Sequence, residues 1–198
     1  MLSPDLTPAP QETRVAPPEM SREEARDTAT YEALLWAFAR PGLVRDLPVV
    51  PDAPAEPAMA LILAALIDRE CRVMTDDPAL AAQARQAGAA IVPAPEADHA
   101  FVAGDAALRV LPDLPSGSAL YPDAAATLVI AAPIGRGREL RLQGPGVEPG
   151  GITLRLGLPP GFAAARARAI RYPAGIDILV VEGHRVVALP RSTLLEEI

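Results

Sequence analysis

The sequence of 198 residues contains no lysine and no asparagine, and all 18 of its positively charged side chains are arginines. Without lysine, the chain cannot form the Schiff base of a pyridoxal phosphate enzyme or supply the lysine of a phosphate-binding P-loop. The single cysteine, Cys71, excludes an internal disulfide and suits a reducing compartment. The net charge of -7 is spread along the chain, so we expect no nucleic-acid partner.

Long hydrophobic runs are also absent. The longest strongly apolar run, residues 58–67, is far shorter than the roughly 20 residues that cross a bilayer, and the N-terminus lacks the pattern of a signal peptide. We therefore expect a cytoplasmic protein without a membrane span. Because 50% of the residues are hydrophobic, the chain can bury one full core, and one domain is expected.

The first 20 residues hold five prolines and little apolar periodicity, which predicts a flexible tail over residues 1–20 and a single α/β domain over residues 21–198. Ser21 and Glu24 have the spacing of a capping box, and the helix they open should stop at Pro41-Gly42. Prolines recur at every third position from Pro48 to Pro57, the period of polyproline II. That period favours a stiff spacer over a segment read by a partner's aromatic groove.

Helix and strand patterns then alternate along the chain. Helical patterns cover residues 58–67, 77–88, 106–111 and 159–170. Strand patterns cover residues 72–74, 89–92, 99–103, 127–132, 140–143, 152–156, 176–181 and 185–189, the last two joined by a turn at Glu182-Gly183. Because closely spaced strands follow residue 140, we expect an α/β fold with three layers (α/β/α) and a mixed sheet.

Several short motifs follow one another from about residue 28 to the end of the chain. They are Tyr31-x-x-Leu34-Leu35 with Pro41-Gly42, Asp68-Arg69-Glu70-Cys71, Gly117-Ser118 with Pro122-Asp123, Leu140-Arg141-Leu142-Gln143-Gly144-Pro145-Gly146, Tyr172-Pro173-Ala174-Gly175-Ile176-Asp177 and Pro190-Arg191-Ser192-Thr193. In this order they resemble the PhnH subunit of the bacterial carbon-phosphorus lyase system. The chain departs from the family pattern most clearly at Glu32, which stands where an arginine is usual.

The resemblance implies a fold like the large domain of pyridoxal phosphate-dependent transferases, without pyridoxal phosphate. It also implies a non-catalytic subunit of the carbon-phosphorus lyase core complex. Such a subunit supports formation of ribose 1-phosphonate 5-triphosphate from a phosphonate and a nucleoside triphosphate. The implied partners are the PhnG, PhnI and PhnJ subunits, and a homodimer is possible. The alternative is a stand-alone enzyme or binding protein for a small phosphate or nucleotide.

The alternative function would use the loop from Gly144 to Gly146. Its backbone N–H groups could hold a phosphate, with Arg141, Arg155 or Arg191 supplying positive charge. A phosphate nest normally opens a helix, whereas here another strand follows, so a tight turn between two strands is the favoured interpretation.

Asp177 lies in an apolar strand, where a carboxylate needs partners. Arg191, or the backbone N–H groups of the Gly175 turn, could provide them. With a turn at Glu182-Gly183, hairpin pairing places the partner of Asp177 near residue 188, within reach of the Arg191 side chain. We therefore predict an Asp177–Arg191 contact, and we favour a structural role for it over a role in binding a ligand.

The remaining reactive side chains indicate no catalytic or metal site. His99, His184 and Cys71 are each alone in their segments, without metal-ligand spacing, and Cys71 adjoins a strand where a thiol is usually packed. Asp68 and Glu70 could form a carboxylate pair, but a solvated corner is favoured. No cofactor is expected.

Overall fold

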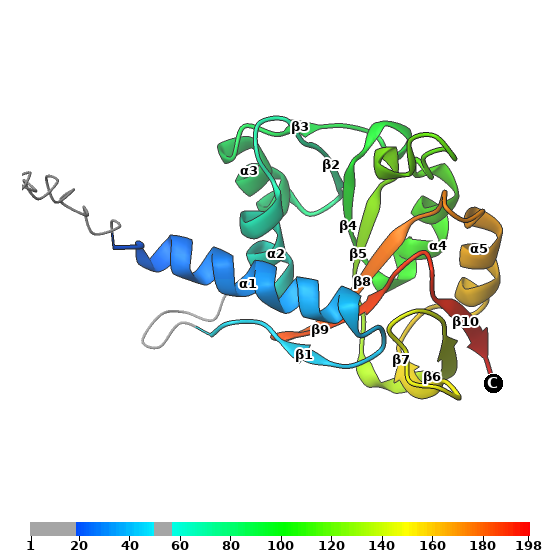
Figure 1. Ribbon diagram of the computed structural model, residues 1–198. Coiled ribbons are helices and arrows are strands. Elements are labelled where there is room, and N and C mark those ends of the chain that lie inside the picture. Colours follow the sequence, from blue (N-terminus) through cyan, green and yellow to red (C-terminus); the bar gives the residue numbers. More distant parts are fainter. Residues whose placement is uncertain (1–18, 50–56) are drawn as a thin grey trace, which may run out of the picture.

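The computed structural model describes residues 19–49 and 57–198 (Figure 1). The predicted tail, except for its last two residues, and Pro51 and Pro54 of the proline-rich spacer lie outside the described residues.

Helices and strands alternate in the first two thirds of the chain, as predicted, and strands predominate after it. The helices are α1 (Arg22–Ala39), α2 (Ala58–Leu66), α3 (Pro78–Gln86), α4 (Ala107–Val110) and α5 (Phe162–Ala169), with 3-10 turns at Ala94–Glu96, Gly104–Ala106, Leu111–Asp113 and Pro122–Ala124. The strands are β1 (Arg45–Asp46), β2 (Arg72–Thr75), β3 (Ala90–Ile91), β4 (His99–Ala103), β5 (Thr127–Ala131), β6 (Ile134–Gln143), β7 (Ile152–Leu156), β8 (Asp177–Glu182), β9 (Arg185–Leu189) and β10 (Leu194–Glu197).

A mixed sheet in the order β1-β9-β8-β5-β4-β2-β3 forms the centre of the described structure. The neighbouring strands β3, β2, β4, β5 and β8 are parallel to one another, whereas β9 pairs antiparallel with both β8 and β1. The predicted mixed sheet is thus confirmed, but the reason for it was wrong. Strands β6 and β7 do not belong to this sheet. They form a separate antiparallel sheet with β10, in the order β10-β6-β7.

Both faces of the central sheet are covered (Figure 1). Because side chains alternate along a strand, Val129 and Leu179 pack under α1, α2 and α3, while Leu128 and Ile178 pack on the opposite face. That opposite face is covered by α4, α5 and the small sheet. The α/β class is confirmed, and the third layer contains a sheet as well as helices.

The ends of two helices follow the predicted chemistry. The Ser21 hydroxyl accepts from the Glu24 backbone N–H at 3.1 Å, and the Glu24 carboxylate accepts from the Ser21 N–H at 2.7 Å. The predicted capping box therefore forms at the N-terminus of α1. The Asp77 carboxylate caps α3 by accepting from Ala79 N at 2.7 Å. Several element ends were wrong: the last helix is shorter than residues 159–170, and β6 begins six residues before the predicted strand at 140.

Across residues 19–49 and 57–198, no helix combines the length and apolar character needed to cross a bilayer.

Candidate functional site

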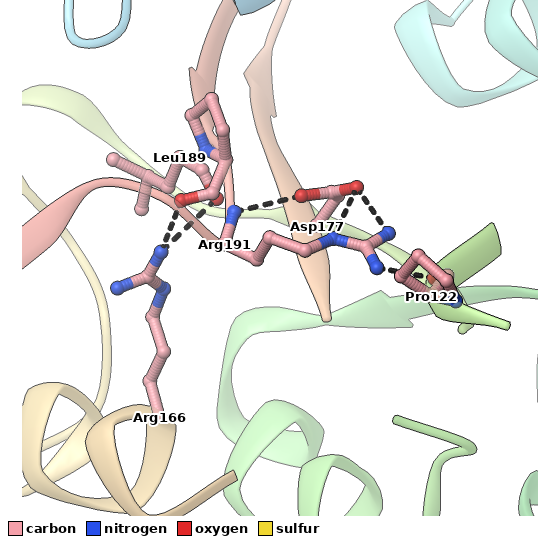
Figure 2. A network of polar contacts seen from close by, with 6 residues as sticks. Pro122, Arg166, Asp177, Leu189 and Arg191 are labelled. Atoms are coloured by element: carbon pink, nitrogen blue, oxygen red, sulfur yellow. Dashed lines mark hydrogen bonds and ion pairs between the residues drawn. The ribbon is translucent and has the colours of Figure 1, made fainter. Parts of the chain in front are cut away.

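Arg191 contacts Asp177, at the start of the same hairpin, and Pro122, which lies far away in the sequence (Figure 2). Its Nε and Nη2 donate to Oδ2 of Asp177 at 3.1 and 2.6 Å, and its backbone N–H donates to Oδ1 at 2.7 Å. Its Nη1 donates to the carbonyl oxygen of Pro122. The predicted Asp177–Arg191 contact is confirmed, with side chains that are 23% and 18% exposed.

The route to this contact differs from the predicted one. The hairpin turn is Gly183-His184, because Glu182 pairs with Arg185, and Ile178 therefore pairs with Leu189. Extended by one residue, this register places Asp177 opposite Pro190 rather than residue 188. Arg191 is thus close enough for its own backbone N–H to bind the carboxylate.

The Gly175 turn was the other predicted partner of Asp177, and that alternative was wrong. The Gly175 N–H donates to the carbonyl oxygen of Ser116 at 2.7 Å instead. Gly175 has φ +152°, and a Cβ there would lie 3.2 Å from Cβ of Arg191. The turn therefore approaches Arg191 closely, and glycine suits both the conformation and the space.

A second arginine, Arg166, holds the same C-terminal segment from α5 (Figure 2). Its Nη2 donates to the carbonyl oxygens of Pro190 at 2.6 Å and Leu189 at 3.3 Å, and its Nη1 donates to that of Thr193 at 2.9 Å. The residue is 2% exposed. Burial lowers the pKa of Arg166 to about 10, although the charge of Asp177 opposes this shift.

The role of Arg166 was not predicted from the sequence. Arginines in a short alanine-rich helix usually face solvent. The available signal was periodicity: Arg166 follows Phe162 and Ala163 by four and three residues, and all three are buried on one face of α5.

The loop from Gly144 to Gly146 is part of the connection between β6 and β7, so two strands flank it as predicted, but the connection runs on to Gly151 and is longer than a tight turn. A Cβ at Gly146 would lie 2.5 Å from the carbonyl oxygen of Ala39, and one at Gly144 would lie 2.7 Å from that of Ser192. Close packing against other backbone therefore explains both glycines.

Two of the three predicted arginines lie beside a cavity of about 360 Å³. Arg141 and Arg191 line it together with Arg166, and Arg141 donates from Nη2 to the carbonyl oxygen of Gly150 at 3.0 Å. Arg155 is not among the lining residues and pairs with Glu139 at 2.6 Å. The described residues that line the cavity are Arg141, Gln143, Arg166, Ala167, Ile170, Arg191, Thr193, Leu194, Leu195 and Glu196.

The other reactive side chains lie in different surroundings. Cys71 is partly buried, with Sγ 3.3 Å from Oδ1 of Asp68, and burial raises the pKa of its thiol. The Asp68 carboxylate also accepts from the Glu70 N–H, which fits a structured corner. Nδ1 of His99 and Nδ1 of His184 are buried and have no hydrogen-bond partner among residues 19–49 and 57–198, and burial lowers the pKa of His99. In the described part of the chain, no three His, Cys, Asp or Glu side chains lie close enough to hold a metal ion.

Comparison with known proteins identifies relatives over most of the chain. Residues 18–196 match the family of bacterial phosphonate metabolism proteins named PhnH. HtxG of Stutzerimonas stutzeri, whose name describes a candidate C-P lyase subunit, is 33% identical over 172 residues, or 85% of each chain. The alpha-D-ribose 1-methylphosphonate 5-triphosphate synthase subunit PhnH of Rhizobium meliloti (strain 1021) is 32% identical over 180 residues, or 85% of this chain and 89% of the relative. The resemblance drawn from the motifs is confirmed.

Proposed function

The chain belongs to the PhnH family, and from this premise we propose that it is a non-catalytic subunit of a carbon-phosphorus lyase core complex in the bacterial cytoplasm. In that role it supports the formation of ribose 1-phosphonate 5-triphosphate from a phosphonate and a nucleoside triphosphate. Its partners are the PhnG, PhnI and PhnJ subunits. The observation that carries the proposal is the family match over residues 18–196, together with relatives named as subunits of such systems.

The environments of the reactive groups support a role in assembly rather than chemistry. A catalytic thiol is normally ionised by a nearby cation, whereas Cys71 lies beside the Asp68 carboxylate, and burial and this charge both raise its pKa. Burial also lowers the pKa of His99, which makes its imidazole a weaker base. These groups are better suited to packing than to turnover.

We also propose that residues 21–198 form one domain related in fold to the large domain of pyridoxal phosphate-dependent transferases. The mixed sheet covered on both faces supports this relation. The cofactor itself does not fit the chain, because no lysine is present to hold its aldehyde. Fold likeness therefore carries no chemistry here.

Exposed apolar side chains along α1 and the turn that follows it support a partner surface. Large apolar side chains that stay in contact with solvent are typical of interaction sites when they gather on one element. The members are Tyr31, Leu35, Trp36, Leu43 and Val44, each more than 40% exposed. We assign this α1 surface to another subunit of the complex.

Co-purification tests the proposal. The tagged chain, expressed with its genomic PhnG, PhnI and PhnJ neighbours, should retain them through size-exclusion chromatography. The Leu35→Glu variant should lose them, whereas Arg85→Glu, an exposed change on α3, should not. Failure of the wild-type chain to retain any subunit would refute the proposal. Retention by Leu35→Glu with loss of a homodimer, measured by light scattering, would reassign the α1 surface to a second copy of this chain.

A further inference from the structure

The cavity beside α5 and β10 carries an excess of positive charge. Arg166, Arg141 and Arg191 line it, and of the described residues that line it Glu196 alone is acidic. Arg191 is neutralised by Asp177. Among the described residues, Arg166 and Arg141 bind backbone carbonyl oxygens and no carboxylate. Even after Glu196 is counted against one of them, a positive charge remains.

Two residues that line the cavity each have a buried polar atom without a hydrogen-bond partner among the described residues. These atoms are Nε of Arg166 and Oγ1 of Thr193, and both residues are 2% exposed. Buried polar groups are normally paired, and a buried cation is normally neutralised. A negatively charged ligand oxygen would supply what both groups lack.

The competing cavity lies where ligands of open α/β sheets usually bind, at the carboxyl ends of parallel strands. It has about 590 Å³ and includes Ala131 of β5 and Val181 of β8. The charged side chains of its described lining are Asp77 and Glu182, both acidic. An anion would be repelled there, so charge favours the arginine-lined cavity at the opposite, amino edge of the sheet.

We propose that the cavity between α5 and β10 binds the tetrahedral oxyanion of a small ligand, a phosphate or phosphonate group held by Arg141, Arg166 and Thr193. Its volume of about 360 Å³ is at the lower end of small-molecule sites, and larger than one such group needs. Ile170 and Leu194 offer apolar contact to the remainder of the ligand. Naming phosphonate among the oxyanions rests on the proposed function, whereas the oxyanion site does not.

Binding is tested on the isolated full chain with three probes at constant ionic strength: inorganic phosphate, methylphosphonate and ATP. Titration calorimetry and thermal melting should show saturable binding of at least one probe. Arg141→Gln should weaken that binding about tenfold, because a charge-assisted hydrogen bond is removed. Thr193→Val should also weaken binding while leaving the melting temperature of the free protein unchanged or higher, since the lost hydroxyl has no partner in the described part of the chain.

The matched control is Arg155→Gln, which removes the same charge from the neighbouring strand outside the cavity. It should leave binding unchanged. An equal loss of binding affinity in Arg155→Gln and Arg141→Gln would overturn the proposal, because the loss would then come from the protein's overall charge and not from a site at the cavity. Absence of saturable binding by all three probes up to about 10 mM would also overturn it. Preference for ATP over the two small anions would identify the group as part of a nucleotide, and the reverse preference as a free anion or phosphonate. The binding test uses the isolated chain, whereas co-purification uses the complex. A failure to bind an anion therefore refutes the oxyanion site without refuting the proposed subunit role.

Discussion

Removing the carboxylate of Asp177 should destabilise the protein more than removing the side chain of Arg191. Asp177→Ala takes away three hydrogen bonds and leaves Nε, Nη2 and the backbone N–H of Arg191 without their carboxylate acceptor. Because a hydrogen bond to a charged group contributes about 1.5 to 3 kcal/mol and the site is partly buried, we expect a cost of about 3 to 4 kcal/mol. Arg191→Ala keeps the backbone bond, so its cost should be about 2 to 3 kcal/mol.

The double variant should cost little more than Asp177→Ala alone, because both changes remove the same interaction. The resulting coupling free energy is about 2 kcal/mol. A matched control exists in the pair Arg72–Asp98, in which backbone N, Nε and Nη2 of the arginine also donate to one carboxylate. Those side chains are 51% and 35% exposed, against 18% and 23% for Arg191 and Asp177. The control cycle should therefore give a coupling below about 1 kcal/mol.

Urea denaturation at pH 7 measures each free energy of unfolding, provided that the m value is the same in all variants. For a chain of this size, about 3 kcal/mol corresponds to a fall in melting temperature of roughly 6 to 12 °C. Additive effects of Asp177→Ala and Arg191→Ala, or equal coupling in the exposed control pair, would refute the reasoning that burial makes this contact strong.

Three further outcomes are expected. Gly146→Ala should lower the free energy of unfolding, measured in urea, by at least about 1 kcal/mol more than Gly150→Ala. Both glycines have positive φ, but a Cβ at Gly146 would meet the backbone carbonyl of Ala39, whereas one at Gly150 would meet nothing within 4 Å; equal losses would contradict this. Burial lowers the pKa of His99, so below the normal histidine pKa of about 6.5 the unfolded state binds more protons than the folded state. The free energy of unfolding should therefore fall as the pH drops below about 6.5, and His99→Gln should abolish this pH dependence. After incubation with pyridoxal phosphate and dialysis, the purified chain should show no persistent absorbance at about 420 nm, since no lysine can form the Schiff base; a retained band would disprove this.

Local chemistry explains why much of the fold could be predicted. The Ser21 capping box and the Asp77 N-cap act within a few residues, so their sequence patterns are sufficient. By contrast, β1 is Arg45-Asp46 and β10 is two leucines followed by two glutamates, so neither has the apolar alternation of a strand, and each pairs with a strand far away in the sequence. The start of β6 was missed for a similar reason, since Gly135 and Gly137 interrupt the apolar alternation on which strand prediction depends.

The part of the candidate site that was predicted depends on residues close together in the sequence. Asp177 and Arg191 flank one hairpin, so even a register displaced by two residues brought them within reach. Arg166 comes from a different element, and its carbonyl acceptors lie 23 to 27 residues further along the chain. No local pattern encodes that distance, and only the packing of α5 against the C-terminal segment reveals it.

The geometry of this site depends on the guanidinium group. Arg191 binds a carboxylate and the Pro122 carbonyl at once, and Arg166 binds three carbonyl oxygens, because their nitrogens point in fixed and different directions. An ammonium group is a single point of charge and cannot span such partners. The segments around Pro122, Asp177 and Arg191, which belong to separate motifs of the family, are therefore held in one arrangement by two side chains. A lysine at either position would keep the charge and lose the arrangement, so in this part of the molecule the motifs act as one structural unit beside the arginine-lined cavity.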